Sequence, residues 1–440
     1  MKELSIFRDN FAVDCPLPST LIHLETIVDR VEDLRGLCLL PALRSLNLTV
    51  LADDFVFFGH PHILMLPSSL ESLDIQNCQH LVGLDVSHLH RLKHLAVHSG
   101  SSKLHFESII FRRQIERQLE TLNLSGDIED LPLNLADRFP NLRSLTFLST
   151  VDNGSDDDDV PNQRLPEGFD RRLPPLLRRL RLAGLSIETP LDLSRLPDLT
   201  EIEFAVCGRN IFLHTQFGDH VQKIVLHGNG LTSLSFDNTT ALPASVTDLE
   251  LDHEDLMSFS DDHLPPYLRT LSVLCFVGPQ LRLAAHTSLR TLEILSEDNI
   301  SLRGDDLPSS LDTLKLHSIK PLDVVFGRQH HALRDIRMSS HAPSEVIDLS
   351  HAVRLQHATF DIAQVREISL PPSLVSIKVG RRAMPCVKAI MDAARALPEL
   401  KWLIFDEPTL NITLPINWQA MYDSHGVMRF NRNSMKAIYY

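Results

Sequence analysis

Histidine is the residue type that first suggests chemistry in this chain, because it is abundant and often paired. The 440-residue sequence contains 22 histidines. Close pairs occur at His60 and His62, His88 and His90, and His330 and His331. A neutral imidazole is a common metal ligand, but a zinc site needs three or four ligands that converge. Since the pairs lie in separate stretches of sequence, we expect solvent-facing histidines, no metal site and no cofactor.

Other signatures of catalysis are missing from the sequence. It has no glycine-rich phosphate loop, no nucleophile elbow and no cysteine pair at metal-ligand spacing. The six cysteines are scattered, at Cys15, Cys38, Cys78, Cys207, Cys275 and Cys386. This usage is typical of a reducing compartment, so we expect an intracellular protein, cytoplasmic or nuclear. We expect no enzyme activity and no small-molecule ligand, and a bound metal found by elemental analysis would revive an enzymatic function.

Charged residues that alternate with apolar ones are the stronger candidates for function. One group contains Arg178, Arg179, Arg181, Glu201 and Glu203, and a second contains Asp248, Glu250 and Asp252. Both groups could hold a protein partner by complementary charge. For the first group a structural interpretation is equally open, because opposite charges on neighbouring strands satisfy each other. The acidic group has few basic neighbours in the sequence, so there the structural interpretation is weaker.

A repeated phrase must position these residues. It consists of an apolar residue, two variable residues, a leucine-like residue, one variable residue and another apolar residue. About eighteen copies start between Met1 and Leu400, as at Leu70 and Leu311, and the commonest step is about 22 residues. A period of roughly 20 to 29 residues with leucines at this spacing is the signature of a leucine-rich-repeat solenoid.

The segment before many copies adds a resemblance to particular repeats. Seven copies are preceded by Leu-Pro and two further residues, as at Leu66-Pro67 before Leu70 and Leu307-Pro308 before Leu311. These lead-ins resemble the short proline-led repeats of budding-yeast proteins, some of which carry an F-box, of slime-mould proteins and of bacterial LPX-type effectors. The resemblance covers about nine tenths of the chain and implies an architecture. It also suggests an alternative function, substrate recognition for ubiquitination, although we find no F-box segment here.

The phrase dictates which side chains are available for binding. Side chains alternate between the two faces of a strand, so the fourth and sixth positions point into the stack and the third, fifth and seventh point out. The outward positions line the concave face of the sheet, which is the usual binding surface of such solenoids. We therefore expect partner-binding residues there, including Arg179, Glu203 and Glu250.

The return segments and two irregular stretches complete the expected architecture. Units of this length leave no room for full return helices, so the convex returns are expected to be extended or single-turn segments. The asparagine that usually caps the turn after the strand is mostly missing, which predicts irregular turns. A helix is expected within residues 384–397, because Val387, Ile390, Met391 and Ala394 recur at helical spacing after a proline. The acidic, apolar-poor stretch 152–163 is expected to be a disordered insert.

Composition sets the domain plan and the class of partner. We expect an α/β-class, β-rich solenoid over residues 1–406 and a C-terminal cap or tail over 407–440. The formal net charge of −15 and pI of about 5.8 disfavour nucleic acid, because binding phosphates needs a basic surface. No stretch has the length and apolarity of a membrane span. The sequence thus predicts a non-catalytic scaffold that binds a protein partner on its concave face.

Overall fold

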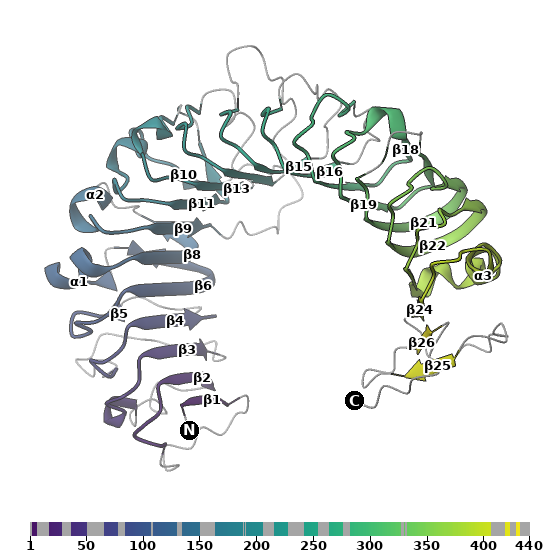
Figure 1. The fold of residues 1–440 in the computed structure, drawn as a ribbon. Coiled ribbons are helices and arrows are strands. Elements are labelled where there is room, and N and C mark those ends of the chain that lie inside the picture. The colour runs from purple at the N-terminus through teal and green to yellow at the C-terminus, as the bar shows by residue number, and fades with distance from the viewer. Residues whose placement is uncertain are drawn as a thin grey trace. The chain divides into compact units, whose positions relative to one another are not determined.

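The structure is a computed structural model and divides into two compact units. It describes residues 2–6, 17–28, 37–50, 66–77, 84–106, 109–129, 134–149, 163–187, 189, 191–205, 215–227, 242–253, 264–275, 282–326, 330, 332–405, 419–422 and 428–431. Unit 1 comprises Met1–Leu231 with Asp237–Pro243, and unit 2 comprises Thr232–Phe236 with Ala244–Tyr440. In each unit, short parallel strands form a ladder and the return segments lie behind it (Figure 1).

The ladder of unit 1 follows the order of the sequence. Its parallel strands are β1 (Glu3–Ile6), β2 (His23–Val28), β3 (Ser45–Val50), β4 (Ser72–Gln76), β6 (His94–His105), β8 (Thr121–Glu129), β9 (Ser144–Leu148), β11 (Arg179–Ala183), β13 (Glu201–Ala205) and β14 (Lys223–His227). The described parts of the returns contain short elements: β5 (Leu84–Asp85), β7 (Ile109–Ile110), α1 (Arg113–Gln118), α2 (Leu135–Arg138), β10 (Gln163–Arg164), η3 (Asp170–Arg172), β12 (Leu185–Ser186) and η4 (Leu193–Arg195).

The ladder of unit 2 has the same plan and a different end. Its parallel strands are β15 (Asp248–His253), β16 (Thr270–Cys275), β17 (Thr291–Ser296), β19 (Thr313–Ser318), β21 (Asp335–Asp348), β22 (His357–Ser369), β23 (Ser376–Val379) and β24 (Trp402–Phe405). The returns contain β18 (Ile300–Arg303), η7 (Gly304–Asp306), β20 (Leu322–Val325), η8 (Arg381–Cys386) and α3 (Val387–Arg395). Beyond β24 the direction reverses, because β26 (Met428–Asn431) runs antiparallel to both β24 and β25 (Gln419–Tyr422).

The core consists of the inward positions of the phrase. Every phrase start named by the periodicity is followed within three residues by a strand of a ladder. In β4, for example, Leu73 and Ile75 are 1% and 0% exposed, whereas their neighbours on the strand are half-buried. Equivalent positions lie side by side on adjacent strands. Leu271, for example, lies between Leu249 and Leu292. The predicted leucine-rich-repeat fold class is therefore confirmed.

The proline-led segments are tight turns that fasten each unit to the one before it. The N–H of Leu70 donates to the carbonyl of Pro67 at 3.1 Å, and Leu311 does the same to Pro308 at 3.1 Å. The serine before the anchor donates to the anchor carbonyl of the preceding unit, at 2.7 Å for Ser310 to Leu289. Proline fixes its own φ, so each lead-in delivers the chain to the ladder in a set direction.

Three further predictions concern a helix near the C-terminus, the acidic insert and the boundary of the solenoid. The helix predicted within residues 384–397 is confirmed as α3, which buries Ile390, Met391 and Ala394, and the shorter α1 and α2 add to it. The acidic insert lies outside the described residues except for Gln163, which begins β10. The boundary predicted between residues 406 and 407 stays a prediction.

Candidate protein-binding surface

The outward side chains of each ladder form three rows at the third, fifth and seventh phrase positions, and we call this surface the open face. In unit 2 the rows from β15 to β22 are Asp248, Thr270, Thr291, Thr313, Asp335 and His357; Glu250, Ser272, Glu293, Lys315, Arg337 and Thr359; and Asp252, Leu274, Leu295, His317, Ser339 and Asp361. Members of a row lie on adjacent strands, roughly 4.8 Å apart along the ladder.

The structure brings the predicted arginines and glutamates of unit 1 together in pairs. Arg179 Nε lies 2.9 Å from Glu201 Oε2, and Arg181 Nε lies 2.8 Å from Glu203 Oε1. The partners occupy the same phrase position on β11 and β13, so the parallel register places them side by side. Arg178 comes just before β11 and is exposed. The charges at the third and fifth positions are thus satisfied within the ladder, which favours the structural interpretation of these four residues.

The predicted acidic group lies on one strand of unit 2. Asp248, Glu250 and Asp252 are half-buried outward residues of β15. The Thr247 hydroxyl donates to Asp248 Oδ2 at 2.7 Å. Their register partners on β16 are Thr270, Ser272 and Leu274, which carry no charge.

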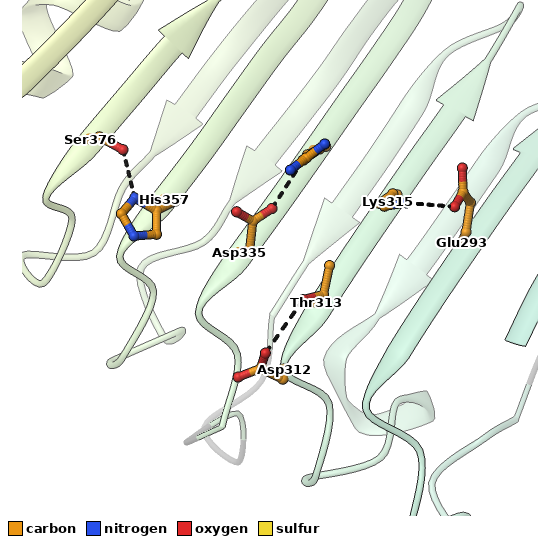
Figure 2. Close-up of polar contacts among 8 residues, drawn as sticks. Glu293, Asp312, Thr313, Lys315, Asp335, His357 and Ser376 are labelled. Atoms are coloured by element: carbon orange, nitrogen blue, oxygen red, sulfur yellow. Dashed lines mark hydrogen bonds and ion pairs between the residues drawn. The ribbon is translucent and has the colours of Figure 1, made fainter. Parts of the chain in front are cut away.

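The middle strands of unit 2 carry a network of polar contacts on the open face, which Figure 2 shows. Lys315 reaches from β19 to Glu293 on β17, with Nζ 2.8 Å from Oε2. Asp335 accepts from the Arg337 guanidinium of its own strand at 3.3 Å. The His357 ring and the Ser376 hydroxyl are joined at 2.7 Å. The Lys315–Glu293 and His357–Ser376 contacts tie neighbouring strands together beside a hollow.

That hollow lies over β19 to β23 and the start of η8. Its volume is about 610 Å³, and its lining includes His317, Arg337, Ser339, Asp361 and Arg381. A second hollow, of about 270 Å³, lies over β16 to β21, and its lining includes the apolar side chains of Leu274, Leu295 and Ile319 together with Glu297 and His341. His317, Ser339 and Arg382 line both hollows, so the two are continuous.

Asp361 fixes the basic end of this surface. Its Oδ1 accepts the backbone N–H of Arg382 at 2.8 Å, and its Oδ2 accepts from the Arg382 guanidinium at 3.0 Å. Gly380 makes the approach feasible, because a Cβ there would lie 2.4 Å from Asp361 Oδ1. The carboxylate thus holds the first turn of η8, which leaves the neighbouring Arg381 exposed at the edge of the hollow.

His317 lies where the two hollows meet. Burial lowers its pKa from the ordinary value of 6.5; the negative charges of Glu293 and Asp361 oppose this shift, and the positive charges of Lys315 and Arg337 add to it. Loss of water disfavours a charged imidazolium, so the neutral ring is favoured. Within the described part of the chain, no hydrogen bond to the His317 ring is present. The ring is therefore a polar group that a ligand can satisfy.

Buried serines at the eighth phrase position hold the turns that frame the apolar hollow. Ser296, Ser318 and Ser340 are at most 5% exposed. The hydroxyl of Ser318 accepts the N–H two residues on at 3.0 Å and donates to the carbonyl of Asp298 in the preceding unit at 2.8 Å. Ser340 repeats this arrangement with the carbonyl of Lys320 at 2.8 Å. We call these three residues the serine ladder.

The seventh-position row contains the residue types of a serine-hydrolase triad in an order that does not fit catalysis. Across the ladder the order is His317, Ser339 and Asp361. A triad needs histidine between the serine and the acid, and here Asp361 is bound to Arg382. The row is therefore suited to hydrogen bonding and charge recognition.

The histidines that suggested a metal have structural contacts where they are described. His88 Nε2 lies 3.1 Å from the carbonyl of Leu66, and the ring of His330 is buried against Phe326, with ring centroids 5.2 Å apart. His60, His62 and His331 lie outside the described residues. Among the residues that the structure describes, no three His, Cys, Asp or Glu side chains are placed to hold a metal ion. No helix in this part of the chain is long and apolar enough to cross a bilayer.

Sequence reasoning found part of this surface and missed its basic end. The alternation placed Thr313, Lys315 and His317 on the outward side, as observed. Arg381 and Arg382 come after the seventh and last outward position of their unit and lie in η8, so the alternation assigned them no face. The sequence Gly-Arg-Arg directly after a strand was the available signal, because a glycine there permits close approach of another chain segment.

Comparisons with known proteins find similar proteins among solved structures only. No family model and no curated protein matches the sequence. Among solved structures, CroV588, described as a novel circular leucine-rich-repeat protein, is similar with a TM-score of 0.44 and 14% identity over 83% of this chain. The chain spans 60% of CroV588. The functional domain of InlJ from Listeria monocytogenes is similar with a TM-score of 0.37 and 15% identity, over 93% of this chain and 85% of that one.

A third similar structure is YopM from Yersinia enterocolitica WA-314, with a TM-score of 0.36 and 14% identity over 83% of this chain and 84% of YopM. At these TM-scores the likenesses carry no argument about function. The finer resemblance to F-box and LPX-type repeats stays a prediction. By its repeated phrase and its parallel ladders, the chain is a leucine-rich-repeat solenoid.

Proposed function

We propose that the protein is a non-catalytic scaffold that binds a protein partner on its open face. The hollow over β19 to β23 carries this proposal. It contains a half-buried imidazole at His317 and an exposed guanidinium at Arg381, and the structure shows no hydrogen bond from either side chain to another described residue. Leu295, next to His317 in its row, is 42% exposed. Apolar surface surrounded by polar groups, with arginine among them, is the usual composition of a protein interface.

A bulky residue in the hollow tests this proposal. Ser339→Trp should block the open face, because Ser339 lines both hollows. Ser301→Trp is the matched control, since Ser301 is exposed on β18 among the return segments. Each full-length protein is immobilised, and the proteins captured from cells of the source organism are quantified by mass spectrometry. Loss of the main captured protein with Ser339→Trp alone supports the proposal, and equal capture by all three proteins refutes it.

The acidic group extends the proposed surface within unit 2. Reversing Asp248, Glu250 and Asp252 to lysine should slow association with the captured partner, because outlying charges act mainly on the on-rate. The difference from wild type should shrink as salt rises, since a Debye length is about 8 to 10 Å at 0.1 to 0.15 M. In unit 1 the pairs Arg179–Glu201 and Arg181–Glu203 are satisfied, which leaves Arg178 as the arginine proposed to meet a partner there.

The expected intracellular location belongs to the same proposal. No contact among the described residues favours the alternative function in ubiquitination.

A further inference from the structure

The two continuous hollows of unit 2 form one groove with chemically different ends, and we call it the binding groove. Leu274, Leu295 and Ile319 make its apolar end. Leu295 and Ile319 are 42% and 49% exposed and line the same hollow, and a patch of exposed apolar side chains is more informative than a single one. An apolar side chain of a partner would remove this surface from water, with a gain of roughly 25 cal/mol per Å² buried.

The other end of the binding groove is basic. Arg337, Arg381 and Arg382 line it together with one acidic residue, Asp361. Asp361 is already bound to Arg382, and Arg337 has an exposed contact with Asp335 at 3.3 Å. Arg381 makes no ion pair with a described residue. This excess of positive charge lies in a chain whose formal net charge is −15, so it is a local feature that a negatively charged ligand can recognise.

The distance between the two ends limits the ligand. The seventh-position row runs from Leu295 on β17 through His317 and Ser339 to Asp361 on β22, and β23 is the next strand. Four strand spacings of about 4.8 Å give roughly 19 Å. An extended chain rises about 3.3 Å per residue, so roughly six residues span the groove.

From these features we infer that the binding groove takes an extended segment of a partner protein that carries an apolar side chain at one end and carboxylates about six residues away. The inference rests on the proposed function and adds the chemistry of the partner. The apolar side chain packs on Leu295 and Ile319, while the carboxylates meet Arg381 beyond the end of β23. His317, between the two ends, hydrogen-bonds the peptide backbone. Nucleic acid shares the negative charge, but its regular phosphates offer nothing for the apolar end.

A peptide selection tests the inference. A displayed library of random peptides of about ten residues, long enough to span the groove, is selected on the immobilised full-length protein. The selected peptides should combine an aliphatic or aromatic residue with aspartate or glutamate about six positions away. In fluorescence anisotropy, exchange of the acidic residues for their amides should weaken binding about tenfold or more, since charge-assisted hydrogen bonds are roughly twice as strong as neutral ones.

Two variants separate the ends of the groove. Arg381→Gln should bring the acid and amide peptides close to equal affinity, while Leu295→Ser should weaken both peptides and keep their ratio. Arg366→Gln is the control for arginine, because Arg366 is exposed on β22, pairs with Glu345 and lies outside both hollows. Arg366→Gln should leave all affinities unchanged.

Several outcomes overturn the inference. They are no enrichment of acidic and apolar residues, equal affinity of acid and amide peptides for the wild type, and equal effects of Arg381→Gln and Arg366→Gln. Displacement of the peptide by a single-stranded oligonucleotide that depends on Arg381 would assign the groove to nucleic acid instead. If Ser339→Trp abolishes capture of the native partner but the selected peptides lack the two-ended pattern, the proposed function stands and this inference fails. If Ser339→Trp keeps the native partner, the proposed function itself fails.

Discussion

Arginines on the open face of unit 1 and at the groove of unit 2 have opposite surroundings. In unit 1, Arg181 stands beside Glu203 of the next strand, and the ion pair is 2.8 Å long. In unit 2, Arg381 lies beyond the end of β23 in η8, where the ladder offers no residue in register. The same side chain is thus satisfied in one place and available in the other.

Register explains the difference. A parallel ladder places equal phrase positions side by side, so opposite charges at equal positions of successive units can meet, as Arg181 and Glu203 do. A residue that leaves the phrase escapes this pairing, as Arg381 does. In a repeat protein of this kind, candidate binding residues are therefore best sought where a unit departs from the phrase.

The comparison assumes that the two units have the same kind of core. Truncating one inward leucine in each unit tests this assumption. Leu180 and Leu271 are 1% and 0% exposed at the fourth phrase position. Leu180→Ala and Leu271→Ala should each lower the free energy of unfolding by about 2 to 5 kcal/mol in denaturant titrations. Thr270→Ala, on the open face, should cost less than about 1 kcal/mol. Similar losses for Thr270→Ala and Leu271→Ala would contradict the assignment of inward and outward faces.

The second largest effect should come from Gly380, which allows Asp361 to hold η8. Gly380→Ala would place a Cβ 2.7 Å from the Cβ and Cγ of Asp361, and overpacking of this kind costs about 1 to 3 kcal/mol. Gly218→Ala in unit 1 is the matched control, because its nearest atoms lie at 3.7 Å. Thermal and denaturant unfolding should show a loss for Gly380→Ala only. Equal stability of the two variants would mean that η8 is not held by this close contact.

A smaller effect on stability should distinguish Arg181, which has an ion-pair partner, from Arg381, which has none among the described residues. A double-mutant cycle with Arg181→Gln and Glu203→Gln should give a coupling of about 0.2 to 1 kcal/mol, the range of exposed pairs. The coupling should fall as salt rises. Arg381→Gln alone should leave the unfolding free energy within about 0.5 kcal/mol of wild type. A larger loss for Arg381→Gln would show that this arginine serves the fold.

The smallest effect concerns pH at the centre of the groove. Burial keeps the pKa of His317 below its ordinary value of 6.5 in the folded protein. Well above pH 6.5 the ring is neutral in both the folded and the unfolded state. Below that, the unfolded chain takes up the proton first, so stability is lost as pH falls towards the lowered pKa. His317→Gln should remove part of the stability loss that the wild type shows as pH falls through about 6.5.

The sequence predicted the ladders well, because the residue pattern that specifies each strand is local in the sequence. Period-two alternation and a constant repeat length specify strand, face and register together, so Arg179 and Glu201 were already assigned to neighbouring strands. The basic end of the groove was not predictable in this way, since it depends on Asp361 meeting Gly380 and Arg382 of the next unit. The turns were expected to be irregular because asparagine is mostly missing. Serine at the eighth position replaces it at Ser318 and Ser340.

The serine ladder has a consequence for how unit 2 opens. The hydroxyls of Ser318 and Ser340 each bond a backbone group of their own turn and one of the preceding turn, so releasing Ser318 frees the carbonyl of Asp298 and the amide of Lys320 together. Regions joined by shared hydrogen bonds open as cooperative blocks in hydrogen exchange. The amides of Asp298, Lys320 and Ala342 should therefore exchange at one common rate, with the rim of the groove breathing as a single segment that spans three repeats.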